Sequence, residues 1–231
     1  MNKYLSIILV APQMGENIGA AARAMKNFNV TDLRIVSPRD GWPNIKAENM
    51  AVGAVDIIQN ARIYNNIEDA TQDLEYLYAT SSAKRDMNKE HVLSKDLSFD
   101  YPLGSKVGIL FGRENCGLTN QEISWANKII TIDTGQFSSM NIAQSIVIIC
   151  YELFNRIDRD DLTNSQKLAT KIELNHFFEH LLSELDKKNF FKIQEKKAQM
   201  VQNIKNIFTR NRLSSSELQT LRGIITKLTL K

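Results

Sequence analysis

Residues 5–25 read LSIILVAPQMGENIGAAARAM and contain the unit from which the fold can be built. The run at 5–12 has the short apolar character of a buried strand. The stretch GENIGAAARAM at 15–25 favours a helix and places one arginine, Arg23, among four alanines. A strand followed at once by a helix is the repeating unit of α/β proteins. Because a permanent cation beside such small side chains calls for a partner, Arg23 is the first candidate functional residue.

Strand-like and helical patterns go on alternating to about residue 157. Further strands are expected at LRIVSP, ARIY, YLYATSS, KVGILFG and KIITID, and helices near residues 49–59, from Ile67, at TNQEISWA and over 141–157. Such alternation indicates an α/β fold, a mostly parallel sheet with helices on both faces. The polar stretch DRDDLTNSQK predicts a linker at 158–170. We therefore expect an α/β domain at 1–157 and a small all-helical extension at 171–231.

The composition is typical of a globular protein, with 43% hydrophobic and 24% charged residues among 231. No apolar run approaches the roughly 18 residues of a membrane helix, and the first residues lack the features of a signal peptide. We expect a cytoplasmic protein without membrane contact. Cys116 and Cys150 lack metal-ligand spacing, so both are interpreted as buried thiols. The segment HFFEH at 176–180 fits an inverted zinc-protease pattern but has no third ligand, so no metal is expected.

The charge is distributed unevenly. Residues 1–154 hold 14 basic and 17 acidic side chains, whereas residues 187–231 hold 11 basic and 2 acidic ones. Such a local excess suits binding to a polyanion, although a solvated helical face is the simpler alternative. The cations expected to contact phosphates are Lys188, Lys192, Lys196, Lys197, Lys205, Arg210 and Arg212.

Three loops rich in glycine or serine follow expected strands: PQMGENIG, LFGRENCGL and DTGQFSSMN. Parallel sheets bind ligands at the carboxyl ends of their strands, so these loops predict a site there. Neither a GxGxxG nor a GxxxxGK[ST] pattern is present, which argues against a conventional nucleotide site. The polar side chains expected to face one crevice are Asn17, Arg23, Glu114, Ser139 and Asn141.

These segments carry a family resemblance. NIGAAARAM, ILFGRENCGL and SSMNIAQSIVIICYE are similar to the three motifs of the SPOUT (TrmH-type) RNA 2′-O-ribose methyltransferases, in the same order. FFEHL and IFTRNRLSSSELQTLRGI resemble the helical extension of those members that modify cytidine or uridine 32 of tRNA. The resemblance implies a SPOUT fold with a C-terminal trefoil knot and S-adenosylmethionine as cofactor. The implied cofactor contacts are Thr80, Ser81, Ser82, Gly112, Ile132, Ser138, Ser139 and Met140.

The resemblance also implies roles in catalysis. Arg23 corresponds to an arginine proposed as base or as phosphate anchor; because guanidinium stays protonated, we favour anchoring. The neighbouring alanines are expected to make room for RNA. Asn17 would orient Arg23 or the ribose. Glu114, Ser139 and Asn141 would complete the catalytic set by holding the loops and the ribose edge.

The implied partners are tRNA and a second copy of the chain. The resemblance predicts a homodimer in which Arg23 of one protomer serves the cofactor of the other, with part of the helix IAQSIVIICYELF in the interface. Methylation of ribosomal RNA is the alternative within the enzyme class. A non-catalytic RNA-binding module of the same fold is the alternative outside it.

Overall fold

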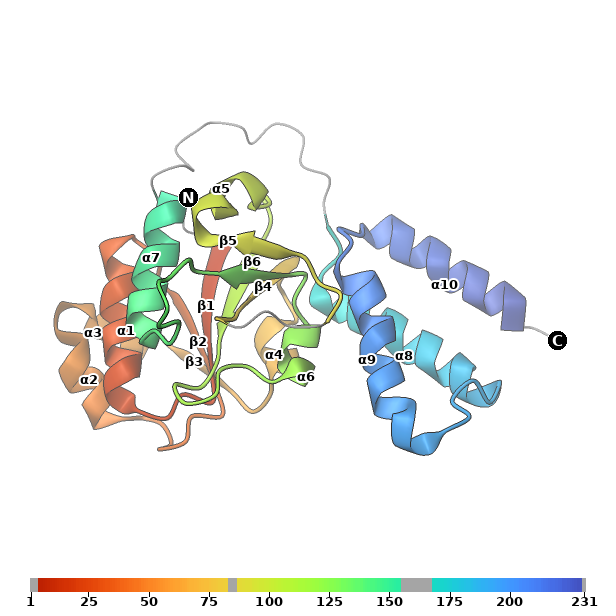
Figure 1. Cartoon of the computed structure of the whole chain (residues 1–231), viewed down its shortest axis with the longest axis horizontal. Coiled ribbons are helices and arrows are strands. Elements are labelled where there is room, and N and C mark those ends of the chain that lie inside the picture. The colour runs from red at the N-terminus through yellow and green to blue at the C-terminus, as the bar shows by residue number, and fades with distance from the viewer. Residues whose placement is uncertain (1–3, 83–86, 155–167, 230–231) are drawn as a thin grey trace.

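The computed structural model describes residues 4–82, 87–154 and 168–229. Its strands are β1 (Leu5–Val10), β2 (Asp32–Val36), β3 (Arg62–Tyr64), β4 (Tyr76–Thr80), β5 (His91–Leu93), β6 (Val107–Phe111) and β7 (Lys128–Thr131). They form one sheet in the order β3-β2-β1-β6-β4-β7-β5, and every neighbouring pair is parallel (Figure 1). The predicted parallel α/β architecture is confirmed. The trefoil knot stays a prediction.

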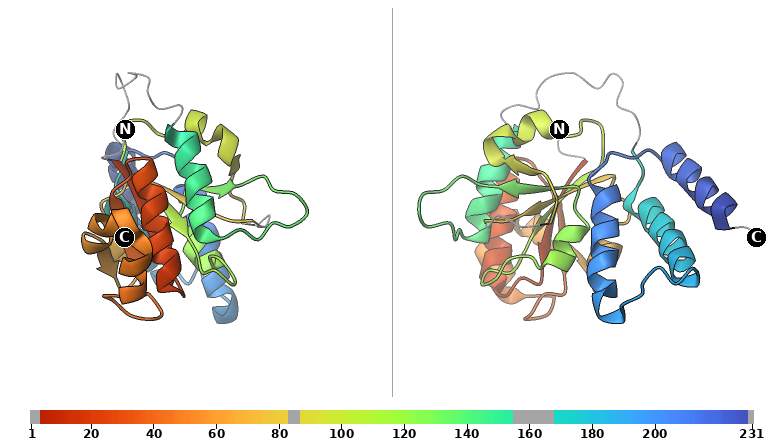
Figure 2. Two further views of the ribbon diagram at one scale, coloured as in Figure 1. Left: turned by 90° about the vertical axis from the view of Figure 1, so that its left-hand side faces the viewer. Right: turned by 45° about the vertical axis from the view of Figure 1, so that its right-hand side comes forward.

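Helices cover both faces of the sheet. They are α1 (Gly15–Asn27), α2 (Ile45–Ala51), α3 (Val55–Gln59), α4 (Ile67–Thr71), α5 (Leu97–Asp100), α6 (Asn120–Ser124) and α7 (Ile142–Phe154). Because side chains alternate along a strand, Ile7 and Leu9 of β1 pack in a core with α1, α2, α3, α5 and α7. Ile8 and Val10 face the opposite way, toward α4 and α6. Figure 2 shows α1 and α7 side by side on one face.

Two details differ from the expected elements. The helix expected at 49–59 is interrupted at Val52, whose φ of 40° begins a short 3-10 turn, so α2 and α3 are separate. Neither β5 nor α5 is expected from the sequence, because runs of three and four residues give too little periodicity.

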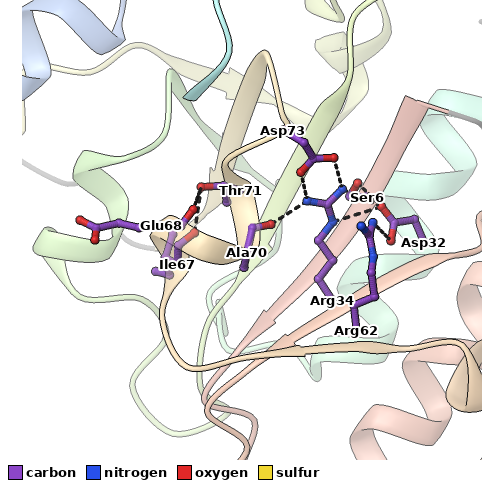
Figure 3. A network of polar contacts seen from close by, with 9 residues as sticks. All are labelled: Ser6, Asp32, Arg34, Arg62, Ile67, Glu68, Ala70, Thr71 and Asp73. Carbon is purple, nitrogen blue, oxygen red and sulfur yellow. Dashed lines mark hydrogen bonds and ion pairs between the residues drawn. The ribbon is translucent and has the colours of Figure 1, made fainter. Parts of the chain in front are cut away.

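An ion-pair cluster around one buried arginine lies at the amino edge of the sheet, where the strands begin (Figure 3). The Arg34 guanidinium is 3% exposed and donates to the carboxylates of Asp32 and Asp73 and to the Ala70 carbonyl. Arg62 donates to the other oxygen of Asp32. Burial would raise the pKa of Asp32, but Arg62, Ser6 and Arg34 outweigh that effect and lower the pKa. We infer that this cluster ties β2 to β3 and α4.

The extension consists of three helices around an apolar core of its own. These are α8 (Lys171–Lys187), α9 (Gln194–Thr209) and α10 (Ser215–Thr229), with Phe177, Phe178 and Leu218 buried between them. Of the expected linker, residues 158–167 lie outside the described residues. Leu168 is buried and bridges to Ser214, and Thr170 caps α8. No helix in the described ranges is long and apolar enough to cross a membrane.

The extension docks against the amino edge through a buried polar contact. Asn127 accepts from the Leu77 backbone and from Lys171 Nζ, at 2.9 and 2.6 Å, and donates to the Thr209 carbonyl. Lys89 Nζ donates to Thr209 Oγ1 and to the carbonyls of Ser124 and Ala126. Burial lowers the pKa of both lysines to about 7. The two parts of the chain are thus joined by satisfied polar groups.

Candidate active site

One pocket of about 360 Å³ opens at the carboxyl edge of β4, β6 and β7. All eight residues expected to contact the cofactor line it: Thr80, Ser81, Ser82, Gly112, Ile132, Ser138, Ser139 and Met140. They come from three loops that lie close together in space, although the residues are spread over 61 positions of the sequence, from Thr80 to Met140. The Thr80 hydroxyl donates to the Leu110 carbonyl at 2.9 Å, which fixes the end of β4 beside β6. Their convergence gives one concave site, and their role toward a cofactor stays a prediction.

The loop after β6 is a tight turn that requires glycine at its start. A Cβ on Gly112 would lie 2.2 Å from the Gly117 carbonyl carbon and 2.3 Å from the Leu118 nitrogen. Because those atoms are backbone, even alanine would force the turn to move. The same turn is held by a bridge between Arg113 and Gly117.

Arg113 and Glu122 support this loop, and sequence reasoning missed both. The two Arg113 terminal nitrogens donate to the two Glu122 oxygens at 3.0 and 2.9 Å. Burial opposes ionisation of Glu122, but Arg113 and the Thr119 backbone lower its pKa below the ordinary value. Glu122 also completes a capping box with Thr119 at the start of α6. The Thr-x-x-Glu spacing in TNQE was the signal that could have revealed it.

Three of the predicted catalytic residues form a hydrogen-bonded chain beside the pocket. Glu114, which lines the pocket, accepts from Asn17 Nδ2 at 2.8 Å and from the backbone nitrogens of Gln13 and Met14. Asn17 Oδ1 accepts from Asn141 Nδ2 at 3.1 Å, and Asn141 Oδ1 accepts from the Ala143 backbone. This series of hydrogen bonds therefore ties the loops after β1, β6 and β7 together.

Arg23 is not in this crevice within a single chain. It lies on an exposed face of α1, does not line the pocket, and has no ion pair among the described residues. The expectation that the alanines leave room for RNA is wrong, because Ala21, Ala22 and Ala24 are buried against the core. The same close packing is seen at Gly19, where a Cβ would lie 2.3 Å from the Ala47 carbonyl oxygen. Small residues on α1 serve helix packing, and Arg23 is left at the surface.

Two further residues of the site are clear in the structure. Ser139 is exposed and lines the pocket, as expected. Cys116 is also exposed at the pocket wall, so its interpretation as a buried thiol is wrong. Cys150 is buried, and burial raises its pKa to about 12. Among the described residues no group of three or more His, Cys, Asp or Glu side chains is arranged to hold a metal.

The seven cations of the extension that are expected to contact phosphates fall into two groups. Lys197 pairs with Asp186, Arg212 pairs with Asp100, and Lys205 lies 4.2 Å above the Trp125 ring. The other four cations, Lys188, Lys192, Lys196 and Arg210, are exposed and have no ion pair within the described ranges. Of these seven cations, only the second group is free to meet a polyanion without breaking a contact of this kind among the described residues.

A family model described as the SpoU rRNA methylase family matches residues 4–151. The chain belongs to this family. A second model, described as the C-terminal domain of tRNA methyltransferase TrmJ, matches residues 172–231. The predicted resemblance to SPOUT ribose methyltransferases is therefore confirmed. The resemblance also covers the three C-terminal helices of this SpoU family member.

Curated and solved relatives agree with that assignment. The chain is 33% identical over 94% of its length to tRNA (cytidine-2′-O-)-methyltransferase TrmJ of Methanocaldococcus jannaschii, covering 96% of that protein. The crystal structure of TrmJ from Z. mobilis ZM4 has a TM-score of 0.90 and 36% identity, covering 97% of this chain and 99% of that one. The SpoU methyltransferase AviRb from Streptomyces viridochromogenes, solved in complex with AdoMet, shares the fold at a TM-score of 0.51 and 17% identity, over 67% and 61% of the two chains.

Proposed function

We propose that this protein transfers the methyl group of S-adenosylmethionine to a ribose 2′-hydroxyl of tRNA in the cytoplasm, at cytidine or uridine 32 of the anticodon loop. The observation that carries the proposal is the convergence of eight sequence-predicted residues on one pocket beside Glu114. TrmJ relatives named for this activity are similar to the chain over nearly its whole length, which supports the substrate.

The pocket suits the cofactor. Its walls offer small hydroxyl residues and backbone around Gly112, so polar backbone atoms are accessible to an adenine edge. Ile132 and Met140 supply apolar surface for the ring. When bound, S-adenosylmethionine supplies an electrophilic methyl group and leaves as S-adenosylhomocysteine once the ribose oxygen has bonded to that carbon.

The chain's own groups would position the reactants. Glu114 accepts from three N–H donors at the start of α1 and just before it, so its role is to hold this segment against the loop after β6. Asn17 keeps one amide hydrogen beyond its bond to Glu114 and can direct it to a ribose oxygen, while its Oδ1, which accepts from Asn141, has a second lone pair that can accept from Arg23. The hydroxyl proton leaves to water or to the neighbouring phosphate. Arg23 anchors that phosphate and stabilises the charge that develops.

Arg23 can do this only from a second protomer, since its own pocket excludes it. The dimer that we propose uses the exposed apolar side chains of α7: Val147, Tyr151 and Phe154, which are 38%, 54% and 42% exposed. Their spacing of four and three residues places them on one helix face. Phe28 at the end of α1 contacts both aromatic rings, with centroids 6.3 and 5.8 Å away. This continuous apolar face next to α1 supports an interface there.

The test is to incubate the protein with labelled S-adenosylmethionine and either total tRNA or ribosomal RNA, and then to map 2′-O-methyl groups. Transfer to position 32 of tRNA is the expected result. Transfer only to ribosomal RNA would replace the proposed substrate. Binding of cofactor and RNA without any transfer would identify a non-catalytic module.

A further inference from the structure

A second cavity of about 450 Å³ lies between α9, the start of α6 and residues 87–88. Six carboxamide side chains line it, and we call it the carboxamide groove: Asn88, Asn120, Gln199, Gln202, Asn203 and Asn206. The remaining lining residues are Met87 and Ile207, so no charged side chain of the described residues lines the groove. A surface so rich in one uncharged polar group is unlike the charged faces elsewhere on the extension.

Carboxamides offer both a donor and an acceptor, which is the pattern that nucleobase edges complement. Asn206 is 5% exposed and donates to the Met87 carbonyl at 3.0 Å, while its Oδ1 has no partner among the described residues. Gln199 Nε2 donates to Asn203 Oδ1 at 3.2 Å, so these two amides are already oriented along the groove. Because buried polar atoms are rarely left unpaired, the Asn206 oxygen indicates that the groove is completed by something else.

The groove is flanked by cations on the same face of α9. Positions 196, 199, 203, 206 and 210 are spaced three, four, three and four residues apart, which places them in one stripe of the helix. The ends of the stripe are Lys196 and Arg210, two of the exposed cations that have no ion pair within the described ranges. The two cations lie 14 positions, or about 21 Å, apart along the helix. A base in the groove would therefore have backbone phosphates within reach of a long cationic side chain toward either end of the stripe.

The groove is also connected to the candidate active site. Asn120 begins α6 directly after the pocket loop that contains Gly112 and Leu118. Thr209 at the end of α9 contacts the Ser124 carbonyl at the end of α6, while Gln199 and Asn203 share the groove with Asn120. Helices α6 and α9 therefore run in the same direction, and the early turns of α9 lie toward the carboxyl edge of the sheet. The right-hand view of Figure 2 shows α9 next to α6.

We propose that the carboxamide groove binds an unpaired nucleobase of the RNA substrate, with Lys196 and Arg210 on the adjoining phosphates. This inference rests on the proposed function, because it takes the RNA as tRNA. Sequence-selective RNA recognition acts mainly on unstacked bases, whose edges are free to hydrogen-bond. The extension would then read a base in addition to neutralising the backbone.

The test combines groove variants with tRNA transcripts that lack one base. The double variant Gln199→Met with Asn203→Leu keeps the helix and the side-chain size but removes the amides. Gln219→Met, an exposed amide on α10, is the matched control. Equilibrium binding is measured for the full chain with transcripts carrying a single abasic nucleotide at each unpaired position, together with methyl transfer to the intact transcript.

We expect the wild-type protein to lose about tenfold in affinity at one abasic position. The double variant should bind intact tRNA with about tenfold lower affinity, and the abasic nucleotide at that position should reduce its affinity no further. The salt dependence of its binding should be unchanged. Lys196→Gln should instead reduce the slope of log affinity against log salt by about 0.7 to 0.9. At each abasic position, the loss of affinity is compared between the wild type and the double variant. If these losses differ by no more than twofold at every position, or if Gln219→Met has the same effect as the double variant, the groove does not read a base. Absence of methyl transfer by the wild type would refute the proposed function instead, since binding and coupling are measured independently.

Discussion

The two edges of the sheet are used in opposite ways. At the amino edge, Arg34 is enclosed by carboxylates, and Asn127 and Lys171 join the extension to the strands through buried hydrogen bonds. At the carboxyl edge, an open pocket is lined by small and exposed side chains. The amino edge is complete within one chain. In the proposed mechanism the carboxyl edge is incomplete within one chain, because Arg23 lies outside its own pocket. We therefore propose that the structural cluster needs one chain, whereas catalysis needs two.

The largest expected effect separates the chemistry from the fold. Arg23→Ala should reduce methyl transfer by about 100-fold or more, as expected for a group that acts mainly in the transition state. The affinity for tRNA should stay within a few fold and the melting temperature should not change, since Arg23 is exposed. Lys26→Ala on the same helix, which removes only a surface pair with Asp56, is the control in single-turnover assays. Equal losses in both variants would remove the special role of Arg23.

At the amino edge, a substitution should instead affect stability. Arg34→Met should lower the free energy of unfolding by about 3 kcal/mol, because Asp32 and Asp73 lose a buried partner. Arg62→Met removes a partner that is 48% exposed and should cost less than about 1 kcal/mol. Denaturant titration gives both values. A cost for Arg34→Met no greater than that for Arg62→Met would show that the cluster is not structural.

Much of this contrast could be predicted from the sequence, but only where the signal is local. The alternation of strands and helices lies in continuous segments, so the parallel sheet followed from it. The three motifs are also continuous, so they revealed the family resemblance, and the pocket residues followed from that resemblance. The Arg34 cluster joins residues 39 positions apart, and no spacing rule identifies such partners. The alanines around Arg23 were misinterpreted because a buried small face and an open one have the same composition. Cys116 was misassigned for a similar reason, since exposure in a tight loop depends on the turn and not on residue type.

A smaller effect is expected in the pocket itself. Substitution at Gly112 is a poor probe of cofactor binding, because any side chain there meets the backbone of its own loop. Met140→Lys removes apolar contact and adds a cation facing a cationic cofactor, so it should weaken S-adenosylmethionine binding at least about tenfold. Phe137→Lys on the same loop, 80% exposed and outside the pocket, is the control in calorimetry. Unchanged affinity in a folded Met140→Lys protein would contradict the assigned pocket.

The smallest effect concerns pH and the docking of the extension. Burial lowers the pKa of Lys171 to about 7 in the folded state, against 10.5 ordinarily. Between those values the unfolded chain binds more protons, so the free energy of unfolding should rise as the pH rises through that window and be flat below it. Lys171→Met should reduce this pH dependence, whereas Lys188→Met, which alters an exposed lysine, should not. Thermal unfolding of the three proteins between about pH 7 and 10 compares them; identical pH profiles would show that Lys171 does not titrate in this way.

Complementation between two impaired chains tests the central claim most directly, with S-adenosylmethionine kept well below the dissociation constant of the Met140→Lys pocket. In the proposed dimer, a mixed pair of Arg23→Ala and Met140→Lys chains has one intact site, made of the pocket of the first chain and the arginine of the second. Random mixing of equal amounts should therefore restore about a quarter of wild-type methyl transfer, because half of the dimers are mixed and each has one working site. Verified mixed dimers with no more activity than either parent would show that Arg23 does not act across the interface.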